Sequence, residues 1–391
     1  MNEVNLNIDE LQDFVGHIIS NNRFLQSNGK NPVAVEVVGE SGIGKTTSVM
    51  TMAKDHGLDV VKLNLAQIEE LGDLVGFPIK QYQMYIEVAG KKKGKWVDEI
   101  AVQAHATKGY LTTGKSRMGY AAPEWIADKK DGGLLILDDW NRADVRFIQA
   151  CMELVDRQTY ISWSLPKDWH IILTANPDNG DYMVNSVDSA QKTRYITANL
   201  KFDVDVWARW AESEGLDSRC INFLLLHPEL VTQETNARSI STFFNSISSI
   251  PKFNDQLPLI QMIGEGSVGN EFASMFTTFI NNKLDLLVTP KELLLGEGEI
   301  LGKLSKSTGT GDSYRADIAS ILATRVSNFA VVYSQDNTIT PKITERITDL
   351  CTKDYFTNDL KYLVVRTIFN GNKKKFSKLM MNPEIIKMTI K

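Results

Sequence analysis

A glycine-rich stretch at residues 39–46 has the spacing of a loop that binds phosphate. Its sequence, Gly-Glu-Ser-Gly-Ile-Gly-Lys-Thr, fits the pattern G-x-x-x-x-G-K-S/T. In this pattern small residues let backbone N–H groups close around phosphate oxygens, the lysine meets the outer phosphates, and the hydroxyl group can ligate Mg²⁺. An apolar run precedes the stretch and a helix pattern follows it, which argues against the alternative of an ordinary glycine-rich turn. The sequence therefore predicts a strand, a phosphate loop and a helix.

This loop and the first turn of the helix supply the candidate nucleotide contacts. The positive end of a helix dipole favours bound phosphate, and so do free backbone N–H groups at a helix start. We assign ATP binding to Gly39, Glu40, Ser41, Gly42, Ile43, Gly44, Lys45, Thr46 and Thr47.

Two adjacent carboxylates, Asp138 and Asp139, follow the apolar run at 134–137. A buried parallel strand presents side chains at its C-terminal edge, where the nucleotide sites of such sheets form. There Thr46 and Asp138 can hold Mg²⁺, and Asp139 can polarise an attacking water. Asn176, at the end of a later apolar run, can orient the same water. Alone an acidic pair is a weak sign, but after a phosphate loop it is a strong one.

Taken together, these motifs resemble the AAA+ ATPases over about residues 30–250. The resemblance rests on the phosphate loop and on three later segments, at 137–143, 174–177 and 190–195. The segments at 73–76 and 139–143 are most similar to the MoxR branch. The resemblance implies that Lys45 and Thr46 are Walker A residues, that Asp138 and Asp139 are Walker B residues, and that Asn176 is the sensor 1 residue.

The same resemblance implies roles for two arginines. Arg194 stands where such proteins place an arginine finger that reaches the γ-phosphate held by a neighbouring subunit, and Arg238 resembles a sensor 2 arginine on a helical lid. The simpler interpretations are a surface arginine for Arg194 and an ion pair with a nearby acid for Arg238. Asp139, Asn176, Arg194 and Arg238 are thus the candidate catalytic residues.

One residue departs from the family pattern. The usual second Walker B acid is Glu, whereas this chain has Asp139, which is one methylene shorter. Displacing a catalytic group by roughly 1 Å can cost on the order of 100-fold in rate. We expect nucleotide binding to survive this change and hydrolysis to be slow.

A nucleotide-binding chain must also be tested for guanine motifs. Asn282-Lys283-Leu284-Asp285 matches N-K-x-D, and the segment at 73–76 matches D-x-x-G. The apolar residues at 271–280 have helical spacing, and no strand pattern precedes residue 73, so neither match has the required context. The adjacent acids instead fit an ATPase with an extra central strand, and we expect ATP rather than GTP.

The elements that must position these residues predict an α/β fold. We expect a three-layer P-loop NTPase sheet domain at 1–200, a helical lid at 201–290 and a helical C-terminal region at 291–391. Strands are expected near 33–38, 59–65, 134–138 and 169–175. A first helix should begin at the cap Asn7, and further helices are expected at 203–215, 218–227, 237–249, 268–287, 314–333 and from Pro341.

Several segments carry weaker expectations. Residues 66–133 show no obvious strand rhythm, and 72–85 is the candidate substrate-facing loop, with an ordinary surface crossover as the alternative. The basic run at 91–95 is interpreted as a solvated hairpin tip in preference to a nucleic-acid contact. Residues 302–313 are rich in Gly, Ser and Thr and predict a flexible linker. Trp207 and Trp210 are expected to be core aromatics.

Composition places the chain among globular proteins of two or three domains. It has 391 residues, 43% hydrophobic and 23% charged, with a net charge of −5. We expect no membrane span and no signal peptide. We also expect no zinc site, since the cysteines Cys151, Cys220 and Cys351 form no CxxC pair. A cytoplasmic location follows from these expectations. Residues 341–391 are locally basic, with 11 Lys and Arg against 5 Asp and Glu. This asymmetry is typical of a contact with nucleic acid or an acidic partner, but a solvated helix face is its more frequent cause.

The resemblance implies an ATP-driven ring, most often of six subunits, that remodels or assembles a client protein. Partners in the MoxR branch often carry a metal-dependent adhesion domain. Two alternatives stay open. A nucleic-acid motor would use the basic segments, although the sequence pI of about 5.7 argues against it. A ring scaffold that binds ATP with little turnover would fit the short acid at position 139.

Overall fold

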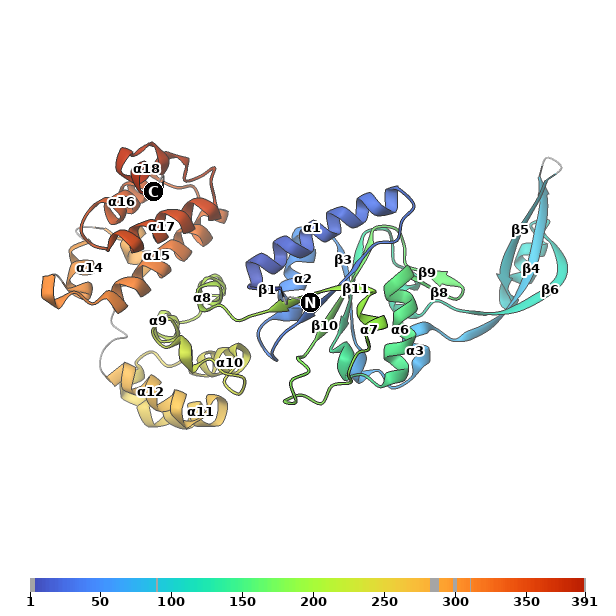
Figure 1. Cartoon of the computed structure of the whole chain (residues 1–391), viewed down its shortest axis with the longest axis horizontal. Helices are drawn as coiled ribbons and strands as arrows, with labels where there is room; N and C mark the ends of the chain where they lie inside the picture. Colours follow the sequence, from blue (N-terminus) through green and yellow to red (C-terminus); the bar gives the residue numbers. More distant parts are fainter. Residues whose placement is uncertain (1–3, 89–90, 282–287, 298–300, 310, 390–391) are drawn as a thin grey trace. The chain divides into compact units, whose positions relative to one another are not determined.

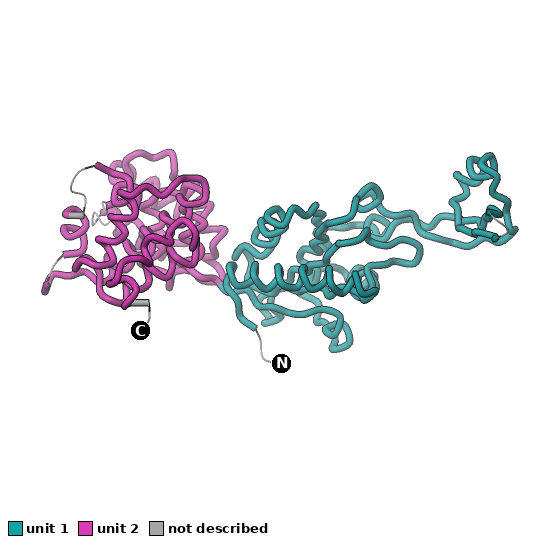
Figure 2. Tube along the Cα trace, turned by 90° about the horizontal axis from the view of Figure 1, so that it is seen from above, with its two compact units in different colours: residues 1–201 teal, residues 202–391 magenta. Residues whose placement is uncertain are grey.

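The computed structural model describes residues 4–88, 91–281, 288–297, 301–309 and 311–389. The chain divides into two compact units, residues 1–201 and 202–391 (Figure 2). None of the helices in the described ranges combines the length and the apolar character needed to cross a bilayer.

Unit 1 is built on a six-stranded sheet in which all neighbouring strands are parallel (Figure 1). The strand order is β1 (Asn5–Leu6), β11 (Tyr195–Leu200), β2 (Ala34–Val38), β10 (Trp169–Ala175), β7 (Gly133–Asp138) and β3 (Asp59–Asn64). The strand β10 lies between β2, which leads into the phosphate loop, and β7, which ends in the acidic pair. The extra central strand predicted from the sequence is thereby confirmed.

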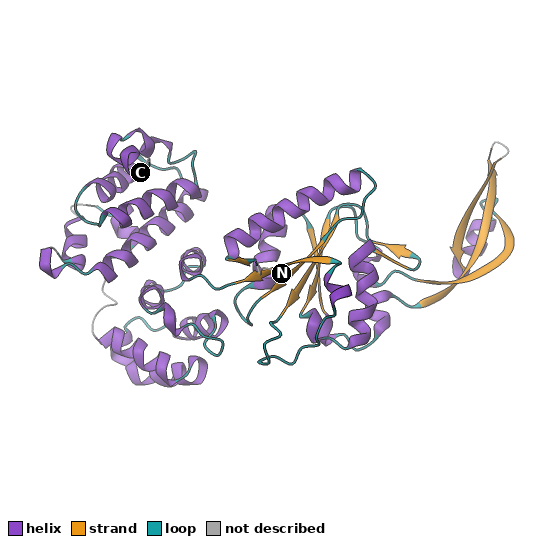
Figure 3. Ribbon diagram, in the orientation of Figure 1, coloured by secondary structure: helices purple, strands orange, loops and turns teal. Residues whose placement is uncertain are grey.

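Helices cover both faces of this sheet (Figure 3). On one face lie α1 (Ile8–Ser27) and α2 (Lys45–Asp55), and on the other lie α3 (Leu71–Val75) and α6 (Val145–Arg157). Leu135 and Leu137 of β7 belong to the same core cluster as Phe147 of α6. Their neighbours along the strand point to the opposite face, because side chains alternate along a strand. The three-layer α/β P-loop fold predicted from the sequence is confirmed.

The first helix begins as its sequence predicts. The Asn7 side chain accepts the Glu10 backbone N–H at 3.0 Å, and the Glu10 carboxylate accepts the Asn7 N–H at 2.9 Å. This capping box satisfies two backbone donors that a helix start otherwise leaves without partners.

Residues 78–120 form a second sheet, which we call the arm. It is antiparallel, with β4 (Pro78–Val88) between the edge strands β5 (Lys91–Asp98) and β6 (Leu111–Tyr120). These strands were not predicted, because residues 66–133 show no obvious strand rhythm. The segment at 72–85, the candidate substrate-facing loop, is not a loop but holds most of α3 and the first part of β4. The basic run at 91–95, predicted as a solvated hairpin tip, is exposed and belongs to β5, where Lys91 pairs with Val88 of β4.

Unit 2 is helical and holds two apolar cores. The first core lies among α8 (Val204–Ser213), α9 (Ser218–Leu226), α10 (Ala237–Ile247), α11 (Leu257–Val268) and α12 (Asn270–Asn281). The second lies among α13 (Pro290–Leu295), α14 (Leu301–Thr308), α15 (Ala316–Asp336), α16 (Pro341–Thr352), α17 (Asn358–Gly371) and α18 (Pro383–Thr389). The helices predicted in this half are confirmed over their described residues, and the boundary at 290 stays a prediction.

Two expectations for unit 2 are wrong in part. Residues 302–313 do not form a flexible linker over their described length, because α14 occupies most of them and its Leu304 is fully buried. Trp207 is buried as predicted, but Trp210 is 39% exposed. The N-K-x-D match at 282–285 lies outside the described residues, whereas the segment before it is helical, as its spacing predicts. The three cysteines are buried thiols.

Candidate nucleotide-binding site

The phosphate loop joins the end of β2 to the start of α2. Gly42 and Gly44 adopt φ values of +76° and +97°, a region that glycine enters at no steric cost. At Gly39 a Cβ atom would lie 2.9 Å from the carbonyl oxygen of Leu200 on the neighbouring strand β11. The glycines are therefore required by the backbone path of the loop and by its close packing against β11.

The side chain of Lys45 is buried and reaches back across the loop. Its Nζ donates to the carbonyl oxygens of Gly39 at 2.6 Å and Glu40 at 2.9 Å, and to Asn176 Oδ1 at 3.0 Å. The cation is thereby held between the phosphate loop and the C-terminal end of β10. Fixing a charge before a ligand arrives lowers the ordering cost of binding.

Asp138 accepts hydrogen bonds from two hydroxyl groups and pairs with one lysine. Thr46 Oγ1 and Thr174 Oγ1 each donate to its Oδ1 at 2.6 Å, and Lys62 Nζ lies 2.9 Å from its Oδ2. Burial raises the pKa of this carboxyl group, but the hydrogen bonds from Thr174 and Thr46 and the Lys62 charge outweigh it, so the pKa lies below its usual value. Asp138 is therefore ionised at neutral pH.

The donor set around Asp138 fits Mg²⁺. Carboxylate and hydroxyl oxygens are hard ligands, and Mg²⁺ is usually bound by one or two carboxylates together with water and substrate phosphates. Thr46 and Asp138 supply such oxygens side by side. Over the described part of the chain no three His, Cys, Asp or Glu residues gather as an alternative metal site.

Asp139 sits on a strained backbone beside Asn176. Its φ of 51° and ψ of 35° lie in the left-handed region, which a non-glycine residue enters only a few per cent of the time. Its N–H donates to Thr174 Oγ1 at 3.1 Å, and its Oδ1 accepts from Asn176 Nδ2 at 3.2 Å. Strain of this kind tends to occur at functional sites and persists only where the surroundings hold it.

Two further pairs hold the turn that carries Asp139. Asn141 donates to the Asn176 carbonyl oxygen at 2.8 Å and accepts the Asn176 N–H at 3.2 Å. Trp140 Nε1 donates to the buried carboxylate of Glu36 at 3.0 Å, and Thr197 donates to the same carboxylate at 2.8 Å. Burial raises the pKa of Glu36 in spite of these hydrogen bonds. The turn after β7 is thereby anchored to β2, β10 and β11.

A tyrosine contacts the phosphate loop from the segment that follows β10. Tyr182 Oη donates to Glu40 Oε2 at 2.6 Å and accepts the Ser41 backbone N–H at 3.2 Å. The loop is thus closed on this side by a side chain that the sequence analysis did not single out.

The structure brings five of the candidate residues into one connected network: Lys45, Thr46, Asp138, Asp139 and Asn176. Within the described part of unit 1, Arg194 makes no hydrogen bond or ion pair with this network. Arg194 precedes β11 and donates to the Ala190 carbonyl oxygen at 3.2 Å. Arg238 is exposed in the first turn of α10, in unit 2. Their assigned roles, like those of the other site residues, stay predictions.

Sequence reasoning missed Lys62, Asn141, Glu36 and Tyr182 as members of the site. The strand pattern did carry a signal for Lys62, because it is a charged residue inside an apolar strand that pairs with β7. Thr174 lies in the segment at 174–177 that carries part of the AAA+ resemblance, but the sequence pattern assigned it no role. No motif marked Tyr182, since its contact with the loop depends on the path of a long segment after β10.

Comparisons with known proteins leave the family open. No family model and no curated protein matches this chain. Two solved structures of variants of RuvB from Thermotoga maritima align with TM-scores of 0.35 and 0.37 at 12% identity, covering 86% of this chain and 93% and 92% of those chains. A candidate ATPase from Cytophaga hutchinsonii aligns with a TM-score of 0.29 at 14% identity, covering 92% and 93%. Because these likenesses are weak, the fold assignment rests on the topology of this chain.

Proposed function

We propose that this protein is an AAA+ ATPase of the MoxR-like branch that binds and hydrolyses ATP in a ring and remodels or assembles a client protein. The observation that carries the proposal is the contact between Lys45 of the phosphate loop and Asn176 at the end of β10, because Asn176 also contacts Asp139. A phosphate-binding cation, a polar orienting group and a candidate base are thus neighbours on three separate segments.

Each residue of the network has a chemical role in this proposal. Lys45 and the glycine-rich loop bind the phosphates of ATP, and Thr46 and Asp138 hold Mg²⁺. When bound, Mg²⁺ neutralises charge that develops on the phosphates. Asp139 accepts a proton from the attacking water, and Asn176 orients that water. Positioning and electrostatic stabilisation account for most of the rate in phosphoryl transfer, so a preformed network suits this reaction.

Two arginines would complete the site. By the resemblance to AAA+ proteins, Arg194 reaches the γ-phosphate held by a neighbouring subunit, which requires a ring and most often one of six. Arg238 would close the helical lid on ATP, and reopening after hydrolysis would convert chemistry into motion of a bound client. The client would be a partner protein, and in the MoxR-like branch such partners often carry a metal-dependent adhesion domain.

A second function is favoured by one specific observation. Asp139 is shorter than the usual Glu and is already hydrogen-bonded to Asn176 at 3.2 Å. A ring scaffold that binds ATP and seldom hydrolyses it would not require the longer Glu side chain at this position.

Steady-state ATP hydrolysis, nucleotide binding and oligomer size, measured on the same variants, test the proposal. We expect Asp139→Asn to lose hydrolysis and keep ATP binding. Arg194→Ala should lose about 10³-fold or more in rate with binding largely intact, since a finger in trans is worth roughly 10³ to 10⁵. The control Lys192→Ala removes a nearby exposed charge and should leave the rate unchanged.

The two functions differ in their outcomes. Rings that form with ATP but hydrolyse it negligibly would favour the scaffold and contradict remodelling. Equal loss of binding and hydrolysis in Arg194→Ala would contradict its role in trans. Unchanged hydrolysis in Asp139→Asn would show that another group is the base.

A further inference from the structure

The arm is the most basic part of unit 1 and has no role in the proposed ATP chemistry. Residues 78–120 contain eight Lys and Arg against three Asp and Glu, in a chain whose net charge is −5. The arm forms its own three-stranded sheet, separate from the sheet that carries the nucleotide-binding site. Its charge and its aromatic residues therefore call for a different explanation.

One face of the arm is covered by the arm's own chain. The connection between β5 and β6 contains η2 (Glu99–Ala101) and α4 (Val102–Ala106). Tyr82 donates to Glu99 of this connection at 3.1 Å, and Lys95 lies 4.5 Å from the Tyr110 ring centre. Met84, which shares a face with Tyr82, is only 1% exposed. This face is the packed side of the sheet.

The opposite face carries aromatic rings with cations beside them. Strand register places Tyr85 and Trp96 on this face, because Gln83 is paired with Trp96 and side chains alternate along β4. The Arg117 guanidinium carbon lies 4.5 Å from the Trp96 ring centre, and Lys92 Nζ lies 5.0 Å from the Tyr85 ring centre. Both cations are exposed.

Gly94, on the strand beside Tyr85, has no side chain that could cover the Tyr85 ring. Gly94 is the residue directly opposite Tyr85 in the β4–β5 pair. A Cβ atom at Gly94 would meet nothing closer than 3.8 Å, and its φ is not in the left-handed region. Neither packing nor backbone geometry therefore requires glycine here, and a branched side chain at this position would lie beside the Tyr85 ring, since directly opposite residues have neighbouring side chains.

Protection against edge pairing explains only part of the pattern. Lysines on an exposed edge strand prevent other chains from pairing with it, which accounts for the run at 91–95 on β5. The same protection extends to Arg117 on the other edge strand, but it does not account for the rings of Tyr85 and Trp96. Of the five cation–ring pairs found within the described residues, four lie in the arm, and two of these, Lys92 with Tyr85 and Arg117 with Trp96, are on the ring-bearing face.

We propose that the ring-bearing face of the arm binds single-stranded nucleic acid. Bases stack on Tyr85 and Trp96, which lie as diagonal neighbours about 7–8 Å apart on the sheet, while Lys92 and Arg117, which the strand register places on the same face, meet the phosphates. Proteins that bind single strands without sequence preference combine aromatic platforms with a basic surface in this way. An acidic protein would match the charge of Lys92 and Arg117 but offers no row of flat bases to stack on the two rings. This activity goes beyond the proposed ATPase and does not depend on it.

Fluorescence anisotropy tests the proposal on the full chain without ATP. The probes are labelled oligo-dT and oligo-U, about 20 nucleotides long so that each exceeds one binding site. Gly94→Val covers the Tyr85 ring and suits a strand, so we expect binding at least about tenfold weaker. The control Ser116→Val adds the same side chain on the opposite face, beside Tyr82, and should stay within about twofold of wild type. Circular dichroism checks that both variants fold.

A second pair of variants tests the phosphate contacts. Lys92→Gln with Arg117→Gln should weaken binding and lower the slope of log K against log salt by about 1.4, since each phosphate contact on a single strand contributes about 0.7. Lys373→Gln with Lys374→Gln removes the same charge from an exposed site in unit 2 and should change neither quantity. The proposal would be overturned if the wild-type protein did not bind, or if a test variant and its control changed binding equally. Competition by polyglutamate as strong as competition by unlabelled oligonucleotide would also overturn it.

Discussion

Asn176 joins the cation of the phosphate loop to the candidate base. Its Oδ1 accepts from Lys45 Nζ at 3.0 Å, and its Nδ2 donates to Asp139 Oδ1 at 3.2 Å. The amide is therefore oriented by both neighbours, since its carbonyl faces the cation and its NH₂ group faces the carboxylate. Its backbone is fixed in turn by Asn141.

This geometry predicts a split effect for Asn176→Ala. We expect a fall in kcat of about 100-fold, because Asp139 loses the partner that orients it, and ATP binding within a few-fold of wild type, because Lys45 keeps its two carbonyl contacts. Steady-state hydrolysis and binding of a fluorescent ATP analogue measure the two effects. Asn179→Ala, in an exposed part of the following loop, is the control, and a loss of binding as large as the loss of kcat would contradict the prediction.

Lys62 should compete with Mg²⁺ for the carboxylate of Asp138. The two side chains form an ion pair at 2.9 Å, and the lysine side chain is 41% exposed. Because a partly exposed pair is worth about 1 kcal/mol at most, we expect Lys62→Met to lower the Mg²⁺ concentration for half-maximal ATP hydrolysis by up to about fivefold. Lys54→Met, on the exposed side of α2, should leave the Mg²⁺ titration unchanged. A higher Mg²⁺ requirement in Lys62→Met would mean that the lysine assists the metal.

The sequence predicted the sheet and the residues at its C-terminal edge because both depend on local signals. The apolar run of β7 is buried on both faces, so it reads as continuous and ends visibly at Asp138. The glycine-rich spacing before Lys45 is equally local. Tyr182 and Glu36 reach the site through contacts between segments far apart in the chain, and no spacing along the sequence encodes such contacts.

The arm escaped prediction for a different reason. Most side chains of β5 and β6 are exposed on both faces, so these strands lack the alternation of apolar and polar residues by which a half-buried strand is found. In the segment at 302–313, glycine, serine and threonine suggested a linker, yet Leu304 packs fully in the second core of unit 2. Tertiary packing outweighed local composition there.

In unit 2, removing one partner of a buried ion pair should cause a large loss of stability, and removing the second partner as well should restore part of it. Arg325 of α15 is 1% exposed, and its NH2 group contacts Glu212 of α8 at 3.1 Å and Ser218 at 2.9 Å. Glu212→Ala leaves this cation buried without its carboxylate, which should cost about 3–5 kcal/mol in the free energy of unfolding. Urea unfolding followed by tryptophan fluorescence measures this change.

The double variant separates the ion pair from simple packing. Glu212→Leu combined with Arg325→Met removes both charges and keeps apolar volume, so we expect it to be more stable than Glu212→Ala, since hydrophobic replacement of a buried pair is often neutral. Arg315→Met, whose pair with Asp317 is half exposed, should cost less than about 1 kcal/mol. Equal losses in all three variants would rule out a special role for the buried charge.

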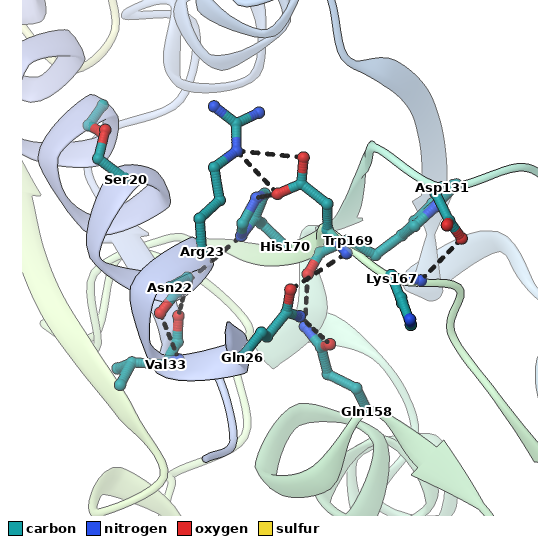
Figure 4. A network of polar contacts seen from close by, with 12 residues as sticks. Ser20, Asn22, Arg23, Gln26, Val33, Asp131, Gln158, Lys167, Trp169 and His170 are labelled. Atoms are coloured by element: carbon teal, nitrogen blue, oxygen red, sulfur yellow. Dashed lines mark hydrogen bonds and ion pairs between the residues drawn. The ribbon is translucent and has the colours of Figure 1, made fainter. Parts of the chain in front are cut away.

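A second polar network, at the start of β10, couples folding to pH. Figure 4 shows α1 beside this strand, with Asn22 and Arg23 near His170. His170 Nε2 lies 3.1 Å from Asp168 Oδ1, and Arg23 Nε donates to the same carboxylate at 2.8 Å. Burial lowers the pKa of His170 and outweighs the opposing effect of Asp168. The folded protein therefore holds a neutral imidazole at this position.

The sign of the pH effect follows from that neutral state. The unfolded chain takes up a proton on His170 near the ordinary histidine pKa of about 6.5, whereas the folded chain takes up this proton only at lower pH. The contribution of His170 to stability is therefore fully present above about pH 6.5 and falls as the pH drops below that value. Burial raises the pKa of Asp168, but the hydrogen bond and charge of Arg23 together with His170 outweigh it, so this pKa is lowered. The contribution of Asp168 to stability is lost only as the pH falls into the lower pKa range of carboxyl groups. We expect His170→Gln to reduce the slope of unfolding free energy against pH between about 6.5 and 5, measured by urea unfolding at each pH. His17→Gln, on the exposed side of α1, should keep the wild-type slope, and an unchanged slope in His170→Gln would place the pH dependence elsewhere in the chain.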